Sequence, residues 1–353
     1  MISRGASAVL IAILCMACGT GGRAASSSAP VAPSPVATAV IDVNDMMGAF
    51  PPATFFVLGS DGLKAIALLN HAIKYTIPLA GRDTQVAVAD EAGRVYVLDQ
   101  PGEGARLRWF DLDSGNERAS RLISGVTVAP TGIAHGALTV DRTTGLVHAL
   151  LRGSTGIAVE EFDWFTLRPS RQIVGGLQCA DRLVSGGGRV AAACLKEGSL
   201  VLSGNGESVR RVAPHALAGI AIAGDGTLMG AASDGRLVRI DRATTELQIA
   251  MPVPLPKGGT LIADGVAVNA GCCFYFGISD PQANDVQSRL VANGFPVIAF
   301  PSTTVPSGGL LVQAPFAYYV IDGKARHIDI NQGFQEVMAA IGGGAMAGAV
   351  AAR

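Results

Sequence analysis

The residues of this chain with the most evident chemistry are its six cysteines. Cys179 and Cys194 lie on either side of three consecutive glycines, residues 186–188, which predict a tight hairpin turn. Strands that meet at such a turn bring paired residues within the distance that a disulfide spans. Two buried thiols are the alternative. We expect a structural disulfide between Cys179 and Cys194. The segment at residues 1–17, described below, predicts export, and exported chains permit disulfides.

A second pair, Cys272 and Cys273, is adjacent in the sequence. A disulfide between neighbouring residues is strained, and strained disulfides are often redox-labile or close to a ligand. Two reduced cysteines at the start of a strand are the alternative. The sequence leaves both interpretations open, so these two residues form a candidate vicinal redox pair.

Cys18 follows a segment typical of exported proteins. Residues 1–17 carry a positive charge near their start and an apolar stretch too short to span a bilayer, which takes about 20 apolar residues. A small residue before Cys18 and a glycine after it resemble the lipobox of bacterial lipoproteins, in which the signal is cleaved and the cysteine lipidated. Cys15 departs from that pattern, which prefers leucine there. An ordinary signal peptide cleaved near Ala25 is the alternative.

Residues 18–37 contain mostly glycine, serine, alanine and proline, with a single charge and no periodicity. They predict a flexible linker. Behind a Cys18 that carries a lipid such as palmitate, this linker would hold a domain away from the membrane. The lipobox resemblance implies that the protein is exported and anchored to the outer face of the bacterial cell membrane, or to a periplasmic membrane surface.

Common sequence motifs for catalysis are missing. The five histidines form no HExxH motif, and the chain has neither a G-x-S-x-G motif nor a P-loop. His148 lies in a predicted strand and could face a central channel, although a buried histidine with satisfied hydrogen bonds is the alternative. We therefore leave the catalytic residues unknown and expect no metal ion and no cofactor.

The elements that position these residues are short apolar runs separated by glycine, aspartate, asparagine and proline, a pattern typical of all-β proteins. Seven runs recur about every 44 residues, the spacing of a four-stranded propeller blade. We therefore expect an all-β fold, a seven-bladed β-propeller of four-stranded antiparallel blades. The runs are Phe55–Leu58, Val95–Leu98, Val147–Leu150, Ala191–Cys194, Met229–Ala232, Phe274–Gly277 and Tyr318–Ile321.

The first repeat resembles those of the YVTN-type β-propellers. Phe55–Leu58, Ile66–Leu69 and Ile77–Gly81 correspond to the strands of that repeat, and Arg236–Asp241 resembles its middle strand. The resemblance implies the fold but not an activity, because the superfamily includes lactonase-like enzymes, quinoprotein-like dehydrogenases and binding scaffolds. Some quinoprotein propellers carry adjacent cysteines beside their cofactor, but their repeated tryptophan motifs are missing from this chain, which has two tryptophans.

The propeller is predicted to occupy residues 38–333. Residues 36–43 alternate in polarity, and we expect them to form the outermost strand of the last blade. Residues 281–292 predict a helical insertion, because Asp-Pro opens the segment and glycine follows it. Such a helix lies on the face where propellers usually bind ligands, and a decorative surface helix is the alternative. Residues 334–353 predict a short helix and an alanine- and glycine-rich tail.

Composition limits the function classes. The chain has 27 Lys+Arg against 28 Asp+Glu, so it lacks the basic excess of nucleic-acid-binding proteins. We expect a lipid-anchored module that binds or scaffolds a protein or a small-molecule ligand, with no nucleic acid as partner. The alternative is an enzyme of the lactonase-like or lyase-like propeller type, with acidic side chains and His148 at the mouth of the channel. A redox role of Cys272 and Cys273 is a third possibility.

Overall fold

The computed structural model describes the backbone from Thr54 to Val350 with short gaps. Side chains are described mainly as far as Ile240, and beyond it only at Lys257, Lys324 and Arg326. The chain divides into two compact units, residues 1–50 and 51–353, and every described element belongs to the second. The gaps are residues 60, 68–69, 80, 134, 205–206, 214–215, 241–246, 253–256, 258–260, 269–273, 280–287, 293–294, 301–306, 314–315, 322–323, 330–333 and 341–343.

All elements in the described residues are β-strands, and they pair antiparallel into sheets of four or five strands. In pairing order, the first sheet is β29 (Gly344–Val350), β1 (Thr54–Gly59), β2 (Gly62–Ala67) and β3 (Ile73–Ile77). The second is β4 (Arg82–Ala89), β5 (Arg94–Gly102), β6 (Gly104–Asp111) and β7 (Glu117–Ile123). In the third, β8 (Thr127–Val128) and β9 (Leu138–Asp141) both pair with β10 (Leu146–Gly153), which β11 (Gly156–Asp163) and β12 (Pro169–Leu177) follow.

The remaining sheets repeat this order. The fourth is β13 (Arg182–Gly186), β14 (Arg189–Cys194), β15 (Ser199–Gly204) and β16 (Glu207–Val212). The fifth is β17 (Leu217–Ile222), β18 (Leu228–Ala232), β19 (Arg236–Ile240) and β20 (Leu247–Pro252). The sixth is β21 (Leu261–Val268), β22 (Phe274–Ser279), β23 (Ser288–Ala292) and β24 (Phe295–Phe300). The seventh is β25 (Ser307–Gln313), β26 (Phe316–Ile321), β27 (Lys324–Asp329) and β28 (Phe334–Ala340).

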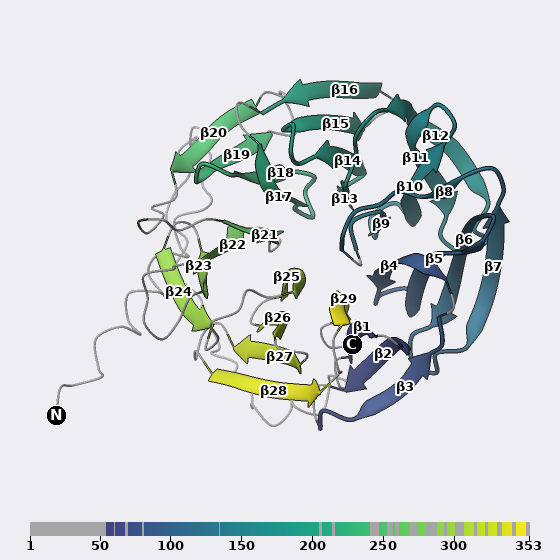
Figure 1. Cartoon of the computed structure of the whole chain (residues 1–353), viewed down its shortest axis with the longest axis horizontal. Coiled ribbons are helices and arrows are strands. Elements are labelled where there is room, and N and C mark those ends of the chain that lie inside the picture. Colours follow the sequence, from purple (N-terminus) through teal and green to yellow (C-terminus); the bar gives the residue numbers. More distant parts are fainter. Residues whose placement is uncertain are drawn as a thin grey trace, which may run out of the picture. The chain divides into compact units, whose positions relative to one another are not determined.

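The innermost strands of successive sheets are neighbours. β29 contacts β4, β4 contacts β9, and the series continues through β13, β17, β21 and β25 back to β29. Figure 1 shows the sheets arranged around a shared centre, with these strands inside and β3, β7, β12, β16, β20, β24 and β28 outside. Each sheet therefore stacks between two others, which cover both of its faces.

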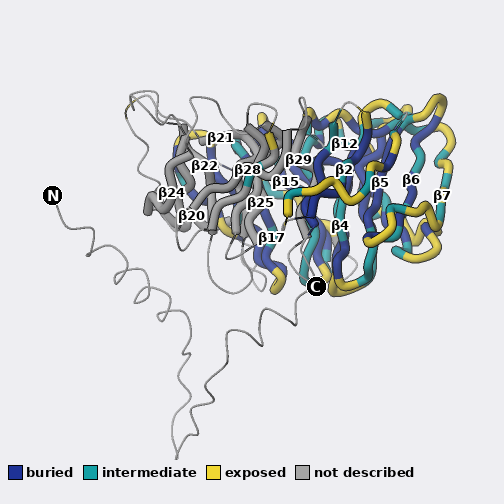
Figure 2. The backbone as a smooth tube through the Cα atoms, turned by 90° about the horizontal axis from the view of Figure 1, so that it is seen from below, coloured by how far each residue is buried: buried dark blue, intermediate teal, exposed yellow. Residues whose placement is uncertain are grey.

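This stacking explains why the apolar runs of the sequence do not alternate. In β5, Val95 and Val97 pack with Phe56 of the preceding sheet, whereas Tyr96 and Leu98 pack with residues of the following sheet. All five side chains are 0% exposed, and burying one of this size contributes roughly 1.5–3 kcal/mol. By contrast, alternate residues of the outer strand β7 are exposed, as Figure 2 shows. A run buried on both faces therefore marks a central strand of a sheet.

The prediction of an all-β, antiparallel fold is confirmed, and so is the placing of the apolar runs in strands. The seven runs fall in β1, β5, β10, β14, β18, β22 and β26, and each of these strands occupies the second position of its sheet. The regular spacing of the seven runs therefore reflects the second strand of each sheet, which recurs once per sheet.

The prediction for the C-terminus is wrong. Residues 334–340 form β28 rather than a helix, and residues 344–350, expected in a flexible tail, form β29. β28 pairs with β27, and β29 pairs with β1. Helical spacing in so short a segment is a weak signal, and the open edges of β27 and β1 supply backbone partners that favour a strand. Residues 36–43 lie outside the described residues, and β28 already holds the outer position expected of them.

The prediction of a helix over residues 281–292 is wrong at its C-terminal end. Residues 288–292 form β23, which pairs with β22 and β24. Residues 281–287 lie outside the described part of the chain. The apolar pair Leu290-Val291 lies within this strand. Pairing with the neighbouring strands therefore determined the conformation here, although the residues at both ends of the segment are typical of helix ends. Among the described residues, no helix is long and apolar enough to cross a membrane.

The third sheet departs from the predicted four-strand pattern, because two short strands share its inner position. The segment between β8 and β9 contains Pro130, which has no N–H to give to a strand ladder. Gln85 of the second sheet holds this segment in place. Its side-chain nitrogen donates to the Ile133 carbonyl at 2.8 Å, and its side-chain oxygen accepts from the Ala137 N–H at 2.8 Å.

Candidate functional site

The predicted bond between Cys179 and Cys194 is present, with the Cα atoms 5.4 Å apart. A carboxylate oxygen of Asp181 and the two sulfurs all lie within 4.8 Å of one another, a spacing that could hold a metal ion. Metal ions bind thiolates, however, and both sulfurs are committed to the disulfide. In this form the group is a covalent link between the start of the fourth sheet and β14.

The hairpin beside this disulfide turns at the second and third of the three glycines. Gly186 pairs with Arg189, and the two glycines between them adopt positive φ angles of 60° at Gly187 and 77° at Gly188. Two consecutive residues with positive φ form the tight turn that suits the twist of a hairpin. Cys179 therefore lies before β13 rather than within its ladder.

The other predicted cysteine sites lie outside the described residues. This applies to Cys18 with the signal segment 1–17 and the linker 18–37, and to the pair Cys272 and Cys273. The expectations of a lipid anchor and of a vicinal redox pair stay predictions.

A row of polar side chains crosses the third sheet on a face that stacks against the fourth. Thr139, His148, Glu161 and Arg171 are successive register partners on β9, β10, β11 and β12, so they project from the same face. Glu161 Oε2 lies 3.6 Å from His148 Nε2 and 3.3 Å from Arg171 Nη2. The Thr139 hydroxyl lies 3.1 Å from the hydroxyl of Ser185 in the fourth sheet.

A pocket of about 100 Å³ separates part of this row from the fourth sheet; we call it the inter-sheet pocket. His148, Glu161 and Arg171 line one side, and Arg189 and Ser203 line the other. His148 is 3% exposed, yet its Nδ1 atom has no hydrogen-bond partner among the residues that the structure describes. A buried polar atom left without a partner costs roughly 1–3 kcal/mol, so it indicates a place that water or a ligand fills.

The Glu161 carboxylate lies beside one of the two ring nitrogens of His148, the Nε2 atom. Its contact with His148 and the charge of Arg171 lower the pKa of Glu161 below the ordinary value of 4.5, against the opposing effect of burial. Glu161 is therefore a carboxylate at neutral pH. A carboxylate beside Nε2 favours the proton on that nitrogen, which leaves a lone pair on Nδ1 in the neutral imidazole. In this tautomer the pocket contains a buried hydrogen-bond acceptor with no donor among the described residues.

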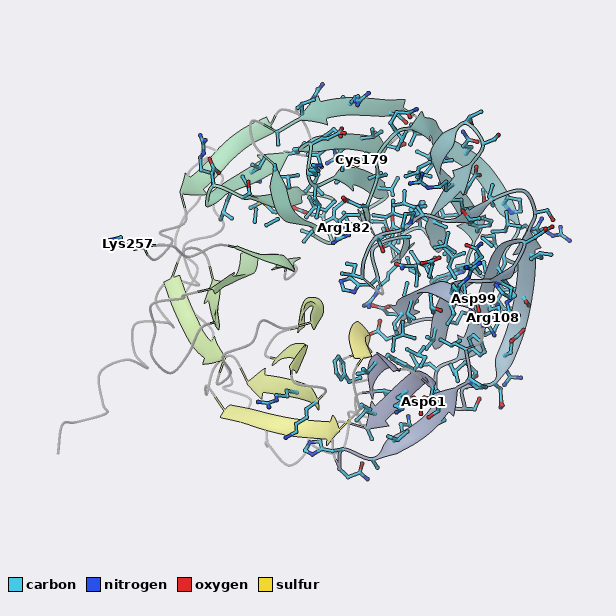
Figure 3. All side chains as sticks on the ribbon, in the orientation of Figure 1. Asp61, Asp99, Arg108, Cys179, Arg182 and Lys257 are labelled. Atoms are coloured by element: carbon cyan, nitrogen blue, oxygen red, sulfur yellow. A yellow bond between two sulfur atoms is a disulfide. The ribbon has the colours of Figure 1, made fainter. Side chains whose placement is uncertain are left out.

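In a second cluster, in the second sheet, each charged side chain faces one of opposite sign, although the buried Nε of Arg108 has no hydrogen-bond partner among the described residues. The Asp99 carboxylate is 0% exposed and accepts hydrogen bonds from Arg106 Nε at 3.0 Å, Arg106 Nη2 at 2.8 Å and Arg108 Nη2 at 2.8 Å. Arg108 also lies 3.4 Å from Glu117. Figure 3 shows Asp99 and Arg108 close together on the sheet. These groups hold β5, β6 and β7 together and leave no carboxylate oxygen of Asp99 open to a ligand.

An arginine stacked among aromatic rings joins the second and third sheets. The Arg94 guanidinium lies 4.8 Å from the ring centre of Trp109, 5.2 Å from that of Trp164 and 4.7 Å from that of Phe165. The Trp109 indole N–H donates to the Phe165 carbonyl at 2.9 Å. Phe165 remains 57% exposed. These contacts lie within the chain, so they account for the stability of this corner and do not by themselves indicate a binding site.

The sequence indicated one residue of the inter-sheet pocket and did not indicate the others. It singled out His148 as a residue that could face the central channel, but His148 lies on β10, with β9 on its inner side, and faces the neighbouring sheet. Glu161 and Arg171 were not predicted. The signal was the acidic pair Glu160-Glu161 inside an otherwise apolar strand, because a charge in a stacked sheet needs a partner.

Comparisons with solved structures identify the fold. The chain superposes on the β-propeller U3-55K with a TM-score of 0.55 and 12% identity, over 76% of this chain and 84% of that one. This chain is a β-propeller. The β-propeller domain of Cps50 (Swd1) from Myceliophteria thermophila gives a TM-score of 0.49 at 15% identity, over 75% of this propeller and 88% of that domain.

Dihydro-heme d1 dehydrogenase NirN also gives a TM-score of 0.49, at 13% identity. The match covers 78% of this propeller but 60% of the length of NirN. No family model matches the chain, and no curated protein does either. At these identities the likeness establishes the fold alone.

Proposed function

We propose that the protein is an exported, lipid-anchored β-propeller of seven blades that acts as a binding module. The closed series of innermost strands supports the blade count, because β29 completes the first sheet and returns the series to its start. The first repeat supports kinship with the YVTN type, and the sequence around Cys18 supports the anchor. The linker 18–37 then spaces the propeller from the membrane.

The observation that carries the binding function is the inter-sheet pocket. Stacked sheets in a propeller normally meet through apolar side chains, as Val97 and Phe56 do between the first two sheets. Between the third and fourth sheets, a buried imidazole instead faces a pocket of about 100 Å³ with an unpartnered nitrogen. Polar groups that converge on a concave site are a usual feature of small-molecule sites. We therefore propose a small molecule as the ligand.

Thermal denaturation tests this function. The full chain is heated with uncharged, anionic or cationic small molecules. A true ligand raises the melting temperature, because at one hundred times its Kd it adds about 2.7 kcal/mol to the free energy of unfolding by mass action. His148→Gln keeps a donor toward Glu161 and removes the acceptor, so it abolishes the shift. Thr139→Val, in the same row but outside the pocket lining, keeps it. A shift that is equal in wild type and His148→Gln would place the ligand elsewhere.

A second candidate function is catalysis by an enzyme of the lactonase-like or lyase-like propeller type. The pairing of His148 Nε2 with the Glu161 carboxylate at 3.6 Å favours it, because a carboxylate-oriented imidazole is a common general base. The expected result is ring opening of simple lactones that depends on His148 and is lost in Glu161→Gln. Turnover that persists in both variants contradicts a role of this pair.

The anchor is tested separately. Cys18→Ser is expected to release the protein from the membrane fraction into the soluble one, and Cys15→Ser, the matched control, is expected to leave it membrane-bound. Mass spectrometry of the mature N-terminus identifies the modification directly. An unmodified N-terminus near Ala25 would show that the leader is an ordinary signal peptide.

A further inference from the structure

The formal charges that line the inter-sheet pocket sum to zero, and each charged group has a partner within the protein. Glu161 pairs with Arg171 at 3.3 Å, and Asp141, 1% exposed, accepts a backbone N–H from the neighbouring sheet at 2.8 Å. Arg189 donates to the Gly226 carbonyl at 2.8 Å. The two carboxylates and two guanidinium groups that line the pocket cancel formally. Neither an anion nor a cation would find an unmatched opposite charge there, so the pocket favours an uncharged ligand.

The hydrogen-bonding requirement of the pocket is specific. His148 Nδ1 is an acceptor, so the group that faces it must donate a hydrogen. The other polar groups of the lining include the donors Arg171 and Arg189 and the hydroxyl of Ser203. A hydroxyl satisfies both sides, because it donates one hydrogen bond and accepts others. Adjacent hydroxyls on one small molecule would meet several of these groups together.

The size of the pocket limits the ligand to a few atoms. A cavity of about 150 Å³ holds benzene, so one of about 100 Å³ encloses roughly four non-hydrogen atoms, and the rest of a larger ligand would lie outside it. We propose that the inter-sheet pocket binds a small polyol, or the hydroxylated end of a longer carbohydrate, through an O–H group donated to His148 Nδ1. This ligand class rests on the proposed binding function and gives it a chemical identity.

The test is a nitrogen-15 NMR titration of the histidine side chains in the full chain. Glycerol, a linear trisaccharide and inorganic phosphate are the three probes. Binding of a polyol moves the His148 Nδ1 signal from that of an open acceptor to that of a hydrogen-bonded one, while Nε2 stays protonated. Saturation by glycerol alone indicates a free polyol, and saturation by the trisaccharide alone indicates the end of a carbohydrate.

Two matched variants of His148 separate the acceptor from the imidazole ring. In His148→Asn the amide oxygen takes the place of Nδ1, so affinity for the bound probe is expected to stay within about threefold of wild type. In His148→Gln the amide nitrogen takes the place of Nε2 and the acceptor is lost, so affinity falls about tenfold or more. Thr139→Val is expected to bind as wild type does, because Thr139 does not line the pocket.

The outcomes distinguish a failure of the proposed ligand class from a failure of the proposed binding function. If phosphate binds at His148 and neither glycerol nor the trisaccharide does, the proposed ligand class is overturned. The protein would still be a small-molecule binding module. An Nδ1 signal that moves with none of the three probes, while other compounds raise the melting temperature through His148, also overturns the class alone. If no small molecule of any charge acts through His148, both proposals fail. The wild-type Nδ1 signal decides these cases even where a variant does not fold.

Discussion

Replacing Asp99 with alanine is expected to destabilise the propeller by about 3–5 kcal/mol. The substitution removes the acceptor of three hydrogen bonds in the second sheet, two from Arg106 and one from Arg108. The Arg106 side chain is 27% exposed and can turn to water. The Arg108 side chain is 7% exposed and keeps the more distant Glu117 at 3.4 Å and the Phe110 ring, whose centre lies 5.1 Å from its guanidinium. The loss is therefore dominated by one buried, poorly compensated charge.

The second substitution in this experiment is Arg108→Met. Methionine fills the space of the arginine stem without its charge, and replacing a whole buried ion pair by apolar groups is often nearly neutral. The double variant Asp99→Ala/Arg108→Met is expected to recover to within about 1–2 kcal/mol of the wild type. Asp61→Ala is the control, because Asp61 lies at the surface beside Lys64 and its loss is expected to leave the stability unchanged.

The assay is equilibrium unfolding in urea at neutral pH, with the melting temperature as a second readout. A loss of 3–5 kcal/mol lowers the melting temperature of a domain of this size by roughly 6–10 °C, at about 2 °C per kcal/mol. The reasoning would be refuted by a single variant that loses less than about 1 kcal/mol. A double variant as unstable as Asp99→Ala would also refute it, since the orphaned arginine would then not be the cause.

Three further perturbations have defined outcomes. Replacing Cys179 and Cys194 with serine is expected to cost about 3 kcal/mol in urea unfolding, because a closed loop of about 15 residues no longer restricts the unfolded chain. Deleting residues 344–350 is expected to prevent folding, measured by limited proteolysis, because β1 loses its partner. The lowered pKa of Glu161 contributes stability that is complete above pH 4.5 and is lost as pH falls through the folded-state pKa; Glu161→Gln is expected to flatten this dependence in acid unfolding.

Each of these outcomes has a matched comparison. Wild-type protein unfolded with a reducing agent should match the double serine variant, and a larger loss on reduction would implicate other cysteines. Deletion of residues 351–353, which follow the last described strand, should leave proteolytic resistance intact. For Glu161, an unchanged acid-unfolding curve in the glutamine variant would show that its contacts with His148 and Arg171 contribute no stability.

Much of the fold was predictable because its repeat is local. Runs such as Val95–Leu98 are apolar on both faces, and this follows directly from a sheet stacked between two others. The ends of the chain were not predictable in the same way. Residues 334–340 have helical spacing of apolar side chains, and only the open edge of β27, formed by a distant part of the backbone, makes them a strand.

The candidate site shows the same limit. The disulfide of Cys179 with Cys194 was predictable, since both cysteines flank one hairpin. The row of His148, Glu161 and Arg171 depends on the register of three strands, and the open Nδ1 atom depends on how the next sheet packs against them. No spacing in the sequence encodes either relation. Sequence reasoning therefore identifies the residues of hairpins better than those of pockets between sheets.

The pairing of β29 with β1 has a consequence for how the protein is made. The first sheet to be synthesised lacks its innermost strand until residues 344–350 have been added. If the chain is exported with its N-terminus leading, β1 waits with an open edge while every later sheet emerges. A product that terminates early cannot close and stays open to proteases. β29 thus makes the stability of the first sheet depend on a segment that is synthesised after every other described strand.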